Sequence, residues 1–499
     1  MKKNRNKKAE LITWLIFVIS ALVLYLIATR HAIFPSRYKL PLLLVIVLLI
    51  CVSGILSILS RRWFRYVSIA LNIILIILIA AVLILLPNLE KRVRSIFKDT
   101  SYDEAIINIY ATNSNFKKEL SDYNEPIFII QKQNDQENQS YAIEQLKEIL
   151  GTDSIKTLQT EDIVSAVEAL YNGEGDLLVL NEVYIDTLED IEKFSNFTND
   201  TKTVISIIKR VEVKEDEPIE RDIINSMFTV YIAGEDTRSG RLSIYGRTDV
   251  DIIVNVNPVT RQVMIVGLPR DTYIPNPALD NGLDKLTHLG NDGIQNTMNG
   301  VSDYYDIDID YYGIVNFNTF KYIVDALGGV DVDNPYYFRS GSYEFPEGNI
   351  HMDGTKALAY VRERKSLPNG DYDRSHHQTI ALKAIIQKLM RFETLGNYDS
   401  LLNALSGQFL TNIEIEDIYN LIALQLNDNS SWDIISYHMG GTGDMCGTAS
   451  MGWDRKLYVV HPFRSQVSFI KEETEKMKNN EIIEQQTLPN EDDTYYIPN

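Results

Sequence analysis

Three long apolar stretches dominate the first hundred residues. Leu11–Thr29, Leu40–Leu59 and Val67–Leu86 are each 19 or 20 residues long, and none contains a charged residue. About 20 helical residues at a rise of ~1.5 Å span the hydrocarbon layer of a bilayer. We therefore predict three transmembrane helices within residues 1–98. A cleavable signal peptide does not fit the first stretch, because two further spans follow it.

Residues 99–220 alternate between helical and strand-like patterns, which predicts an α+β domain. Apolar residues at helical spacing predict helices, and short β-branched runs predict strands. The helices are expected at Tyr141–Leu150 and Glu161–Tyr171, and the strands at Asp176–Leu180 and Val204–Ile208. Four consecutive charges followed by Pro218 predict a solvated linker at the end of this domain, with a charged turn inside a single domain as the alternative.

Residues 221–475 have the texture of an α/β sandwich, in which a central sheet is flanked by helices. Phe228–Ala233, Val250–Val256 and Val263–Leu268 are short, apolar and β-branched, as expected of buried strands. Strands and helices that alternate in this way pack as helical layers on a sheet. Helices are expected at Phe317–Leu327, Asp353–Val361, Arg374–Met390, 397–408 and 414–425, and further strands at Trp432–His438 and Lys456–Val460. We also expect a strand where Asp306, Asp308 and Asp310 alternate with Ile, and a flexible acidic tail over 476–499.

The net charge of the chain changes sign near residue 98, where the apolar stretches end. Residues 1–98 contain fifteen Lys or Arg and two acidic residues, a net charge of +13. The whole chain carries -20, so the remaining residues carry -33. An acidic body disfavours nucleic acid as a ligand, because phosphate backbones need a basic face.

Two cysteines are too few for a disulfide scaffold or a zinc motif. Cys51 lies in an apolar run and Cys446 in a glycine-rich segment, with no CxxC pair. We expect both to be buried small apolar residues and expect no zinc-ligand set.

The positive charges next to the spans set the expected orientation. With the N-terminus inside, eight Lys or Arg lie on the cytoplasmic side and seven on the outer side. The dense N-terminal cluster favours the cytoplasm for this end. An odd number of spans then places the large C-terminal part outside the cell.

Polar residues gather where the predicted strands of the second domain end. Arg247 and Asp249 precede one strand, and Arg270 and Asp271 follow the next. Ligands commonly bind where strands covered by helices end. Further arginines and a glutamine come later in the chain: Arg362, Arg364, Arg374 and Gln378.

This set suits a diphosphate, because guanidinium groups bind phosphate oxygens in pairs. Asp236 and Asp249 offer oxygen ligands for Mg²⁺. Scattered surface ion pairs are the alternative interpretation. His376 and His377 are adjacent, which suits neither a metal pair on one helix face nor a catalytic triad, and we find no P-loop.

Residues 225–391 contain seven ordered motifs: Arg247-Thr248-Asp249, Leu268-Pro269-Arg270-Asp271-Thr272, Lys285-Leu286-Thr287-His288, Ile309-Asp310-Tyr311-Tyr312, Ala326-Leu327-Gly328-Gly329-Val330-Asp331-Val332, Tyr360-Val361-Arg362-Glu363-Arg364 and Gly370-Asp371-Tyr372-Asp373-Arg374 through Gln378. This series resembles the LytR-CpsA-Psr family, and the three preceding spans with an extra domain look most like its streptococcal CpsA-type members. By this resemblance, 99–220 would be an extracellular accessory domain and 221–475 the catalytic domain.

The resemblance implies a magnesium-dependent phosphotransferase on the outer face of a Gram-positive cell membrane. It would move a glycopolymer, capsular polysaccharide or wall teichoic acid, from a polyprenyl-pyrophosphate carrier to peptidoglycan, with capsule-assembly proteins as further candidate partners. Asp236 and Asp249 would bind the metal. The pyrophosphate would be held by Arg247, Arg270, Arg362, Arg364, Arg374 and Gln378.

Two questions stay open at this point. An acceptor hydroxyl needs a general base, and Asp271 and Asp371 are both candidates. The alternative function is a membrane regulator of capsule biosynthesis, a transcriptional attenuator that binds polyprenyl phosphate without chemistry.

Overall fold

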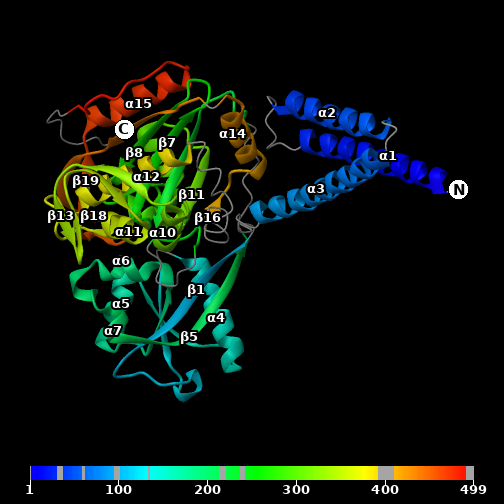
Figure 1. The fold of residues 1–499 in the computed structure, drawn as a ribbon. Coiled ribbons are helices and arrows are strands. Elements are labelled where there is room, and N and C mark those ends of the chain that lie inside the picture. Colours follow the sequence, from blue (N-terminus) through cyan, green and yellow to red (C-terminus); the bar gives the residue numbers. More distant parts are fainter. Residues whose placement is uncertain are drawn as a thin grey trace.

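The computed structural model describes most of the chain and contains three parts (Figure 1). The described residues are 2–30, 38–58, 62–94, 102–132, 135–212, 221–235, 242–390, 409–428 and 430–489. The predicted linker at 214–218, the predicted helix at 397–408 and Asp236 lie outside them.

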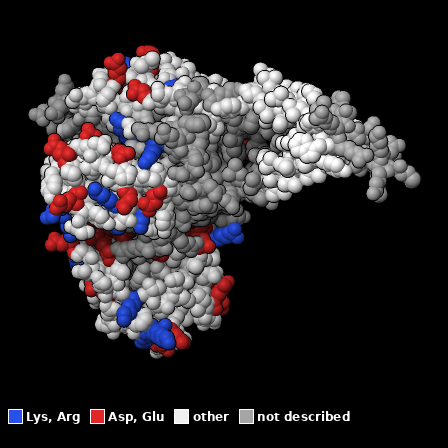
Figure 2. Space-filling model, in the orientation of Figure 1, with Lys and Arg blue, Asp and Glu red and all other residues white. Residues whose placement is uncertain are grey.

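The first part is a bundle of three apolar helices. They are α1 (Lys2–Arg30), α2 (Lys39–Ile58) and α3 (Arg62–Arg94). Each contains a window long and apolar enough to cross a membrane: Glu10–Arg30, Lys39–Leu56 and Tyr66–Ile84. Large apolar side chains on the outside of this bundle are exposed, and on the face seen in Figure 2 its described part is almost entirely white, the colour of uncharged residues. Such a surface suits lipid and not water.

The second part is a five-stranded sheet with the order β3-β2-β4-β1-β5. The strands are β1 (Tyr102–Thr112), β2 (Ile127–Gln131), β3 (Lys156–Thr160), β4 (Leu177–Asn181) and β5 (Thr201–Glu212). The helices are α4 (Gln136–Leu150), α5 (Ile163–Asn172), α6 (Ile185–Glu189) and α7 (Phe197–Asp200). Parallel pairs β2–β3 and β2–β4 stand beside antiparallel pairs of β1 with β4 and β5. This mixture is the α+β domain that the sequence predicts.

The third part is built on a six-stranded sheet with the order β16-β11-β6-β7-β8-β17. Its strands are β6 (Phe228–Glu235), β7 (Val250–Asn257), β8 (Gln262–Leu268), β11 (Tyr311–Asn316), β16 (Phe409–Thr411) and β17 (Asp433–His438). Its helices are α8 (Leu286–Leu289), α9 (Ile294–Tyr305), α10 (Phe317–Ala326), α11 (Gly354–Arg362), α12 (Asp371–Leu389), α14 (Ile415–Asp428) and α15 (Arg464–Lys478). Shorter paired strands are β9 (Tyr273–Asn276) with β10 (Gly282–Lys285), β12 (Val330–Asn334) with β15 (Gly348–Met352), β13 (Phe338–Ser340) with β14 (Tyr343–Phe345), and β18 (Gly441–Thr448) with β19 (Gly452–Pro462).

Strand residues alternate between two helical layers, which makes this part a sandwich. Tyr231 and Ile253 face one apolar core that includes residues of α9 and α15. Val230 and Ile252 face the other, against α12 and α14. Because successive strand side chains point to opposite faces, both faces must be apolar, and this explains the unbroken apolar runs in the sequence. The predicted α/β sandwich fold is confirmed.

Three sequence expectations differ from the structure. Asp306–Asp310 is not a strand, since Asp306 ends α9 in a left-handed conformation (φ 52°) and β11 begins only at Tyr311. The described part of the predicted tail, 476–489, packs on the sandwich, where Met477 and Ile483 are buried. Neither cysteine is buried as expected: Cys51 is exposed on α2, and Cys446 is half-buried on β18.

Candidate functional site

The candidate site lies at one edge of the six-stranded sheet. β7 runs antiparallel to both β6 and β8, with Gly234 opposite Val250 and Asp251 opposite Leu268. The end of β6, the start of β7 and the end of β8 therefore meet at the same edge. Asp249 is fixed there by a backbone hydrogen bond from its N–H to the Gly234 carbonyl, at 2.8 Å.

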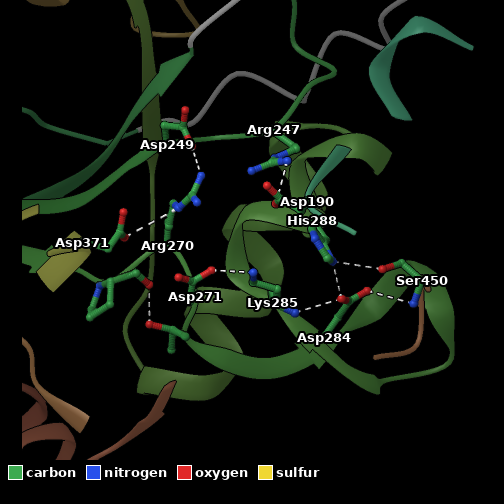
Figure 3. A network of polar contacts seen from close by, with 12 residues as sticks. Asp190, Arg247, Asp249, Arg270, Asp271, Asp284, Lys285, His288, Asp371 and Ser450 are labelled. Carbon is green, nitrogen blue, oxygen red and sulfur yellow. Dashed lines mark hydrogen bonds and ion pairs between the residues drawn. The ribbon is translucent and has the colours of Figure 1, made fainter. Parts of the chain in front are cut away.

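Arg270 joins the loop after β8 to two other segments (Figure 3). Its Nη1 lies 2.6 Å from Asp249 Oδ1, and its Nε lies 3.6 Å from Asp371 Oδ2. Burial alone would lower the pKa of Arg270, but the nearby carboxylates raise it above its ordinary value. Burial alone would raise the pKa of Asp249, yet Arg270, Arg247 and Arg374 together lower it. Both groups stay charged at neutral pH.

Asp371, at the start of α12, gathers three of the predicted arginines. Arg374 Nη2 lies 2.7 Å from Asp371 Oδ1, and Arg364 Nε lies 3.8 Å from the same oxygen. Among the described residues, the buried Arg374 Nε has no hydrogen-bond partner. A buried N–H without an acceptor is costly, so this guanidinium is suited to receive an anion.

Asp271 is placed differently from Asp371. Its Oδ1 lies 2.6 Å from Lys285 Nζ, and both side chains are buried. Burial would raise the pKa of Asp271, but Lys285 and Arg270 outweigh it and lower the pKa. The ion pair joins the Arg270 loop to β10, which suits a structural role better than proton transfer.

Gln378 lines an apolar pocket, and Arg362 contacts Phe317, another residue of its lining. The Arg362 guanidinium lies over the Phe317 ring, 4.6 Å from its centroid. Gln378 Nε2 donates to the Val361 carbonyl at 3.4 Å. The pocket measures about 70 Å³ and is lined mainly by apolar residues of α10, α12 and strands β6, β7 and β11, among them Phe317, Phe320, Leu382 and Ile385.

A second, larger cavity lies between the two domains. It measures about 390 Å³, and acidic residues of both domains line it, together with Arg247. Glu235 lines this cavity and the apolar pocket, so the two adjoin at the end of β6. A polar chamber beside an apolar pocket suits an amphiphilic ligand.

Asp190, which follows α6 in the first domain, is a residue of the site that the sequence did not predict. Its Oδ2 lies 2.9 Å from Nη1 of Arg247, whose side chain is only 9% exposed (Figure 3). An ion pair therefore joins the first domain to the candidate site. No local motif marks Asp190, because its partner is more than fifty residues away in the chain.

Asp251 is a second residue near the site that the sequence did not predict. It lies on β7, two residues after Asp249. It is buried, and Tyr231 Oη donates to its Oδ1 at 2.5 Å. Burial raises the pKa of Asp251 to about 7. An aspartate inside the apolar run Val250–Val256 is the sequence signal that could have marked it as a buried carboxyl.

The histidines expected to lack a catalytic role are aromatic packing residues. His377 is buried and stacks on Tyr360, with ring centroids 4.3 Å apart. Burial lowers its pKa to about 4, so the ring is neutral at physiological pH.

The residues beside the cavity fit a magnesium ion by their chemistry. Asp249 and Glu235 both line the cavity, and both offer only oxygen donors. Mg²⁺ prefers such ligands and keeps several waters, so two carboxylates beside an open cavity suffice. Asp236, the other predicted ligand, lies outside the described residues.

The LytR_cpsA_psr family model matches residues 194–459, more than half of the chain. The chain belongs to this family. The match covers the whole six-stranded sheet and the arginines of the candidate site. It begins within the first domain, before β5, and ends within β19.

Several relatives carry the name polyisoprenyl-teichoic acid–peptidoglycan teichoic acid transferase TagU. The protein from Enterococcus faecalis is 35% identical over 192 residues, which are 38% of this chain and 63% of the relative. The protein from Bacillus subtilis is 29% identical over 253 residues, 50% of this chain and 77% of the relative. The crystal structure of B. subtilis TagU aligns at 27% identity with a TM-score of 0.39, covering 53% of this chain and all of that one.

Proposed function

We propose that this protein transfers a glycopolymer from a polyprenyl-pyrophosphate carrier to peptidoglycan on the outer face of the membrane. The main support is the set of buried arginines, Arg270 and Arg374 foremost, beside an apolar pocket. A diphosphate with a lipid tail has both features that this arrangement would recognise. The names of the relatives support the same reaction class.

The proposed reaction is a phosphoryl transfer. An acceptor hydroxyl oxygen of peptidoglycan attacks the phosphorus next to the polymer and forms a new P–O bond. The P–O–P bond breaks, and polyprenyl phosphate leaves with the bridging oxygen. Charge that builds on these oxygens is stabilised by guanidinium groups held in place before the reaction.

Mg²⁺ bound by Asp236 and Asp249 would neutralise phosphate charge in this site. We propose Asp371 and not Asp271 as the general base, because Asp271 is buried against Lys285. Asp371 contacts Arg270, Arg364 and Arg374, the groups proposed to receive phosphate oxygens. When the phosphates take over these donors, the Asp371 carboxylate is free to accept the hydroxyl proton.

The lipid tail is proposed to enter the apolar pocket. At about 70 Å³ the pocket accepts only a short part of a polyprenyl chain. Binding of a longer part of the tail would therefore need this pocket to widen. Arg362, which lies over Phe317 at this pocket, would then meet the ligand where tail and headgroup join.

The decisive experiment uses the full chain in a detergent or bilayer, with peptidoglycan, Mg²⁺ and one of two donors. The donors are polyprenyl pyrophosphate that carries a capsular oligosaccharide and the same carrier with a teichoic acid precursor. We expect covalent polymer on peptidoglycan, which chelation of Mg²⁺ abolishes. The donor that reacts names the polymer class. Tight lipid binding without product from either donor would favour the regulator instead.

A further inference from the structure

A cluster of three metal-ligand side chains lies on the β18–β19 hairpin, apart from the arginine site. Asp444, Cys446 and His461 each offer one ligand atom, and these atoms lie within 4.8 Å of one another. Cys446 Sγ is 3.4 Å from Asp444 Oδ2 and 3.8 Å from His461 Nε2. His461 Nε2 is 3.5 Å from Asp444 Oδ2.

These separations match the edges of a tetrahedral zinc site. Zinc–ligand lengths of about 2.3 Å for sulfur and about 2.0–2.2 Å for nitrogen or oxygen place ligand atoms about 3.4–3.6 Å apart. Two of the three observed distances, 3.4 and 3.5 Å, lie in that range, and the third, 3.8 Å, is slightly longer. The atoms thus form one triangular face of a coordination tetrahedron.

A catalytic relay does not explain the arrangement. In a Cys-His-Asp relay the carboxylate contacts the imidazole nitrogen that the thiol leaves free. Here the thiol and the carboxylate both approach the same nitrogen, His461 Nε2. Three different ligand atoms, each within 3.8 Å of the other two, form an arrangement that a single metal ion can join.

The hairpin holds the three residues in place. Asp444 and Cys446 are two residues apart on β18, and His461 is on β19, paired with that strand. The Tyr273 ring packs edge-on against His461, with centroids 5.3 Å apart and planes at 82°. His461 is 10% exposed in its side chain and Asp444 44%, so the fourth position opens toward solvent.

We propose that Asp444, Cys446 and His461 bind a zinc-type divalent cation, with water as the fourth ligand. Thiolate and imidazole select such an ion over Mg²⁺, which takes oxygen ligands. This site is chemically distinct from the one at Asp249. It does not depend on the proposed transferase function.

The site is joined to the loop that carries Arg270 and Asp271. Val460 N–H, beside His461, donates to the Asp271 carbonyl at 2.8 Å, and Tyr273 Oη donates to the Gly447 carbonyl at 2.5 Å. A cation that clamps β18 to β19 therefore also steadies this loop. Its binding to the folded state alone would raise thermal stability.

Cobalt titration of the full chain in detergent, reduced and stripped of metal, tests the proposal. We expect a thiolate-to-cobalt charge-transfer band that Zn²⁺ removes by competition and that excess Mg²⁺ does not. Cys446→Ser should abolish the band, while Cys51→Ser, the matched loss of the other thiol, should keep it. Zn²⁺ should also raise the melting temperature of the wild type and not that of Cys446→Ser.

Asp444→Asn provides a second test at an exposed side chain, where folding is not at risk. It should weaken cobalt binding by at least about tenfold, since even residues that only support metal ligands contribute that much. No charge-transfer band in the wild type, or a band that persists in Cys446→Ser, would overturn the proposal. Equal displacement by Mg²⁺ would do the same.

Discussion

At the scale of single residues, the candidate site is a set of arginines held by carboxylates. Arg270 contacts Asp249 and Asp371, and Arg374 contacts Asp371 from one helical turn away. The carboxylates balance buried positive charge until an anionic ligand arrives. These ion pairs therefore keep the guanidinium groups in position for phosphate.

Replacing Arg270 by alanine should reduce polymer attachment by at least about 100-fold, the usual effect of removing one donor to developing charge. The matched control is Arg261→Ala, which removes a guanidinium from the turn at the opposite end of β7 and β8. Attachment to peptidoglycan by the full chain is the measurement. Equal losses in the two variants would mean that Arg270 acts through folding alone.

Asp251 should make stability depend on pH. Its folded pKa is about 7 against an ordinary value near 4, so between these values the folded state keeps a proton that the unfolded state has lost. This group therefore lowers the free energy of unfolding by about 1.4 kcal/mol for each pH unit from about pH 4 to about pH 7. Above about pH 7 Asp251 is ionised in the folded state as well, so the loss of stability reaches its full value and no longer grows with pH.

Asp251→Asn should remove that loss, because the amide stays neutral and its oxygen still accepts from Tyr231. The difference in melting temperature between variant and wild type should grow in favour of the variant as pH rises from 4 to 7. Thermal unfolding at several pH values measures it. Parallel curves over this range would show that Asp251 ionises normally.

At the scale of elements, helices α10 and α12 form the walls of the apolar pocket. Asn316 caps α10, where its side chain accepts from the Thr319 N–H, and Gly328 and Gly329 follow the helix with positive φ. Such capping fixes the ends of a helix and so the position of its apolar face. Phe317 and Phe320 are thereby held toward Leu382 of α12.

Leu382→Gln should weaken binding of a long-chain polyprenyl pyrophosphate roughly 5- to 150-fold. The amide would lie in an apolar pocket without a partner, at a cost of about 1–3 kcal/mol. Inorganic pyrophosphate should bind as it does to the wild type. Leu389→Gln, at an exposed position on the same helix, is the control. An unchanged long-chain affinity in Leu382→Gln would place the lipid elsewhere.

At the scale of the whole molecule, the domain built on β1–β5 closes one side of the site. Asp190 pairs with Arg247, Asp103 accepts from Ser243 Oγ and from Ile244 N–H at 2.7 Å each, and Asp162 pairs with Arg455. Of these contacts, the Asp190 pair involves an arginine proposed to hold the pyrophosphate. A phosphate that binds Arg247 must compete with this carboxylate.

Asp190→Asn should therefore tighten binding of the pyrophosphate donor by several-fold, about the value of one partly exposed ion pair. Asp162→Asn is the control. It weakens the ion pair with Arg455 across the same interface, and Arg455 is not one of the arginines proposed to hold the pyrophosphate. Donor affinity of the full chain is the measurement. Weaker binding in Asp190→Asn would show that Asp190 belongs to the donor site.

The local sequence was sufficient to predict the helices and strands and the types of residue at the site. The strands from Phe228, Val250 and Val263 and the helices around Phe317 and Arg374 lie within a few residues of their predicted places. Apolar periodicity reports burial directly, and burial decides which face of an element packs. The domain limits, the outward orientation, the magnesium ion and the roles of the site residues stay predictions.

Which side chains meet is set by the folded chain and not by local pattern. The sequence identified Arg247 as a site residue but took Cys446 for a buried apolar residue, and their neighbours Asp190 and His461 are distant in the chain and carry no motif. Asp271 and Asp371 looked equivalent until the fold placed one against Lys285 and the other among arginines. The sequence by itself determined three apolar spans, two folded domains and the kinds of groups available, because these depend on local hydropathy. Only the tertiary structure decided their partners, because ion pairs and metal-ligand distances depend on how strands and helices pack.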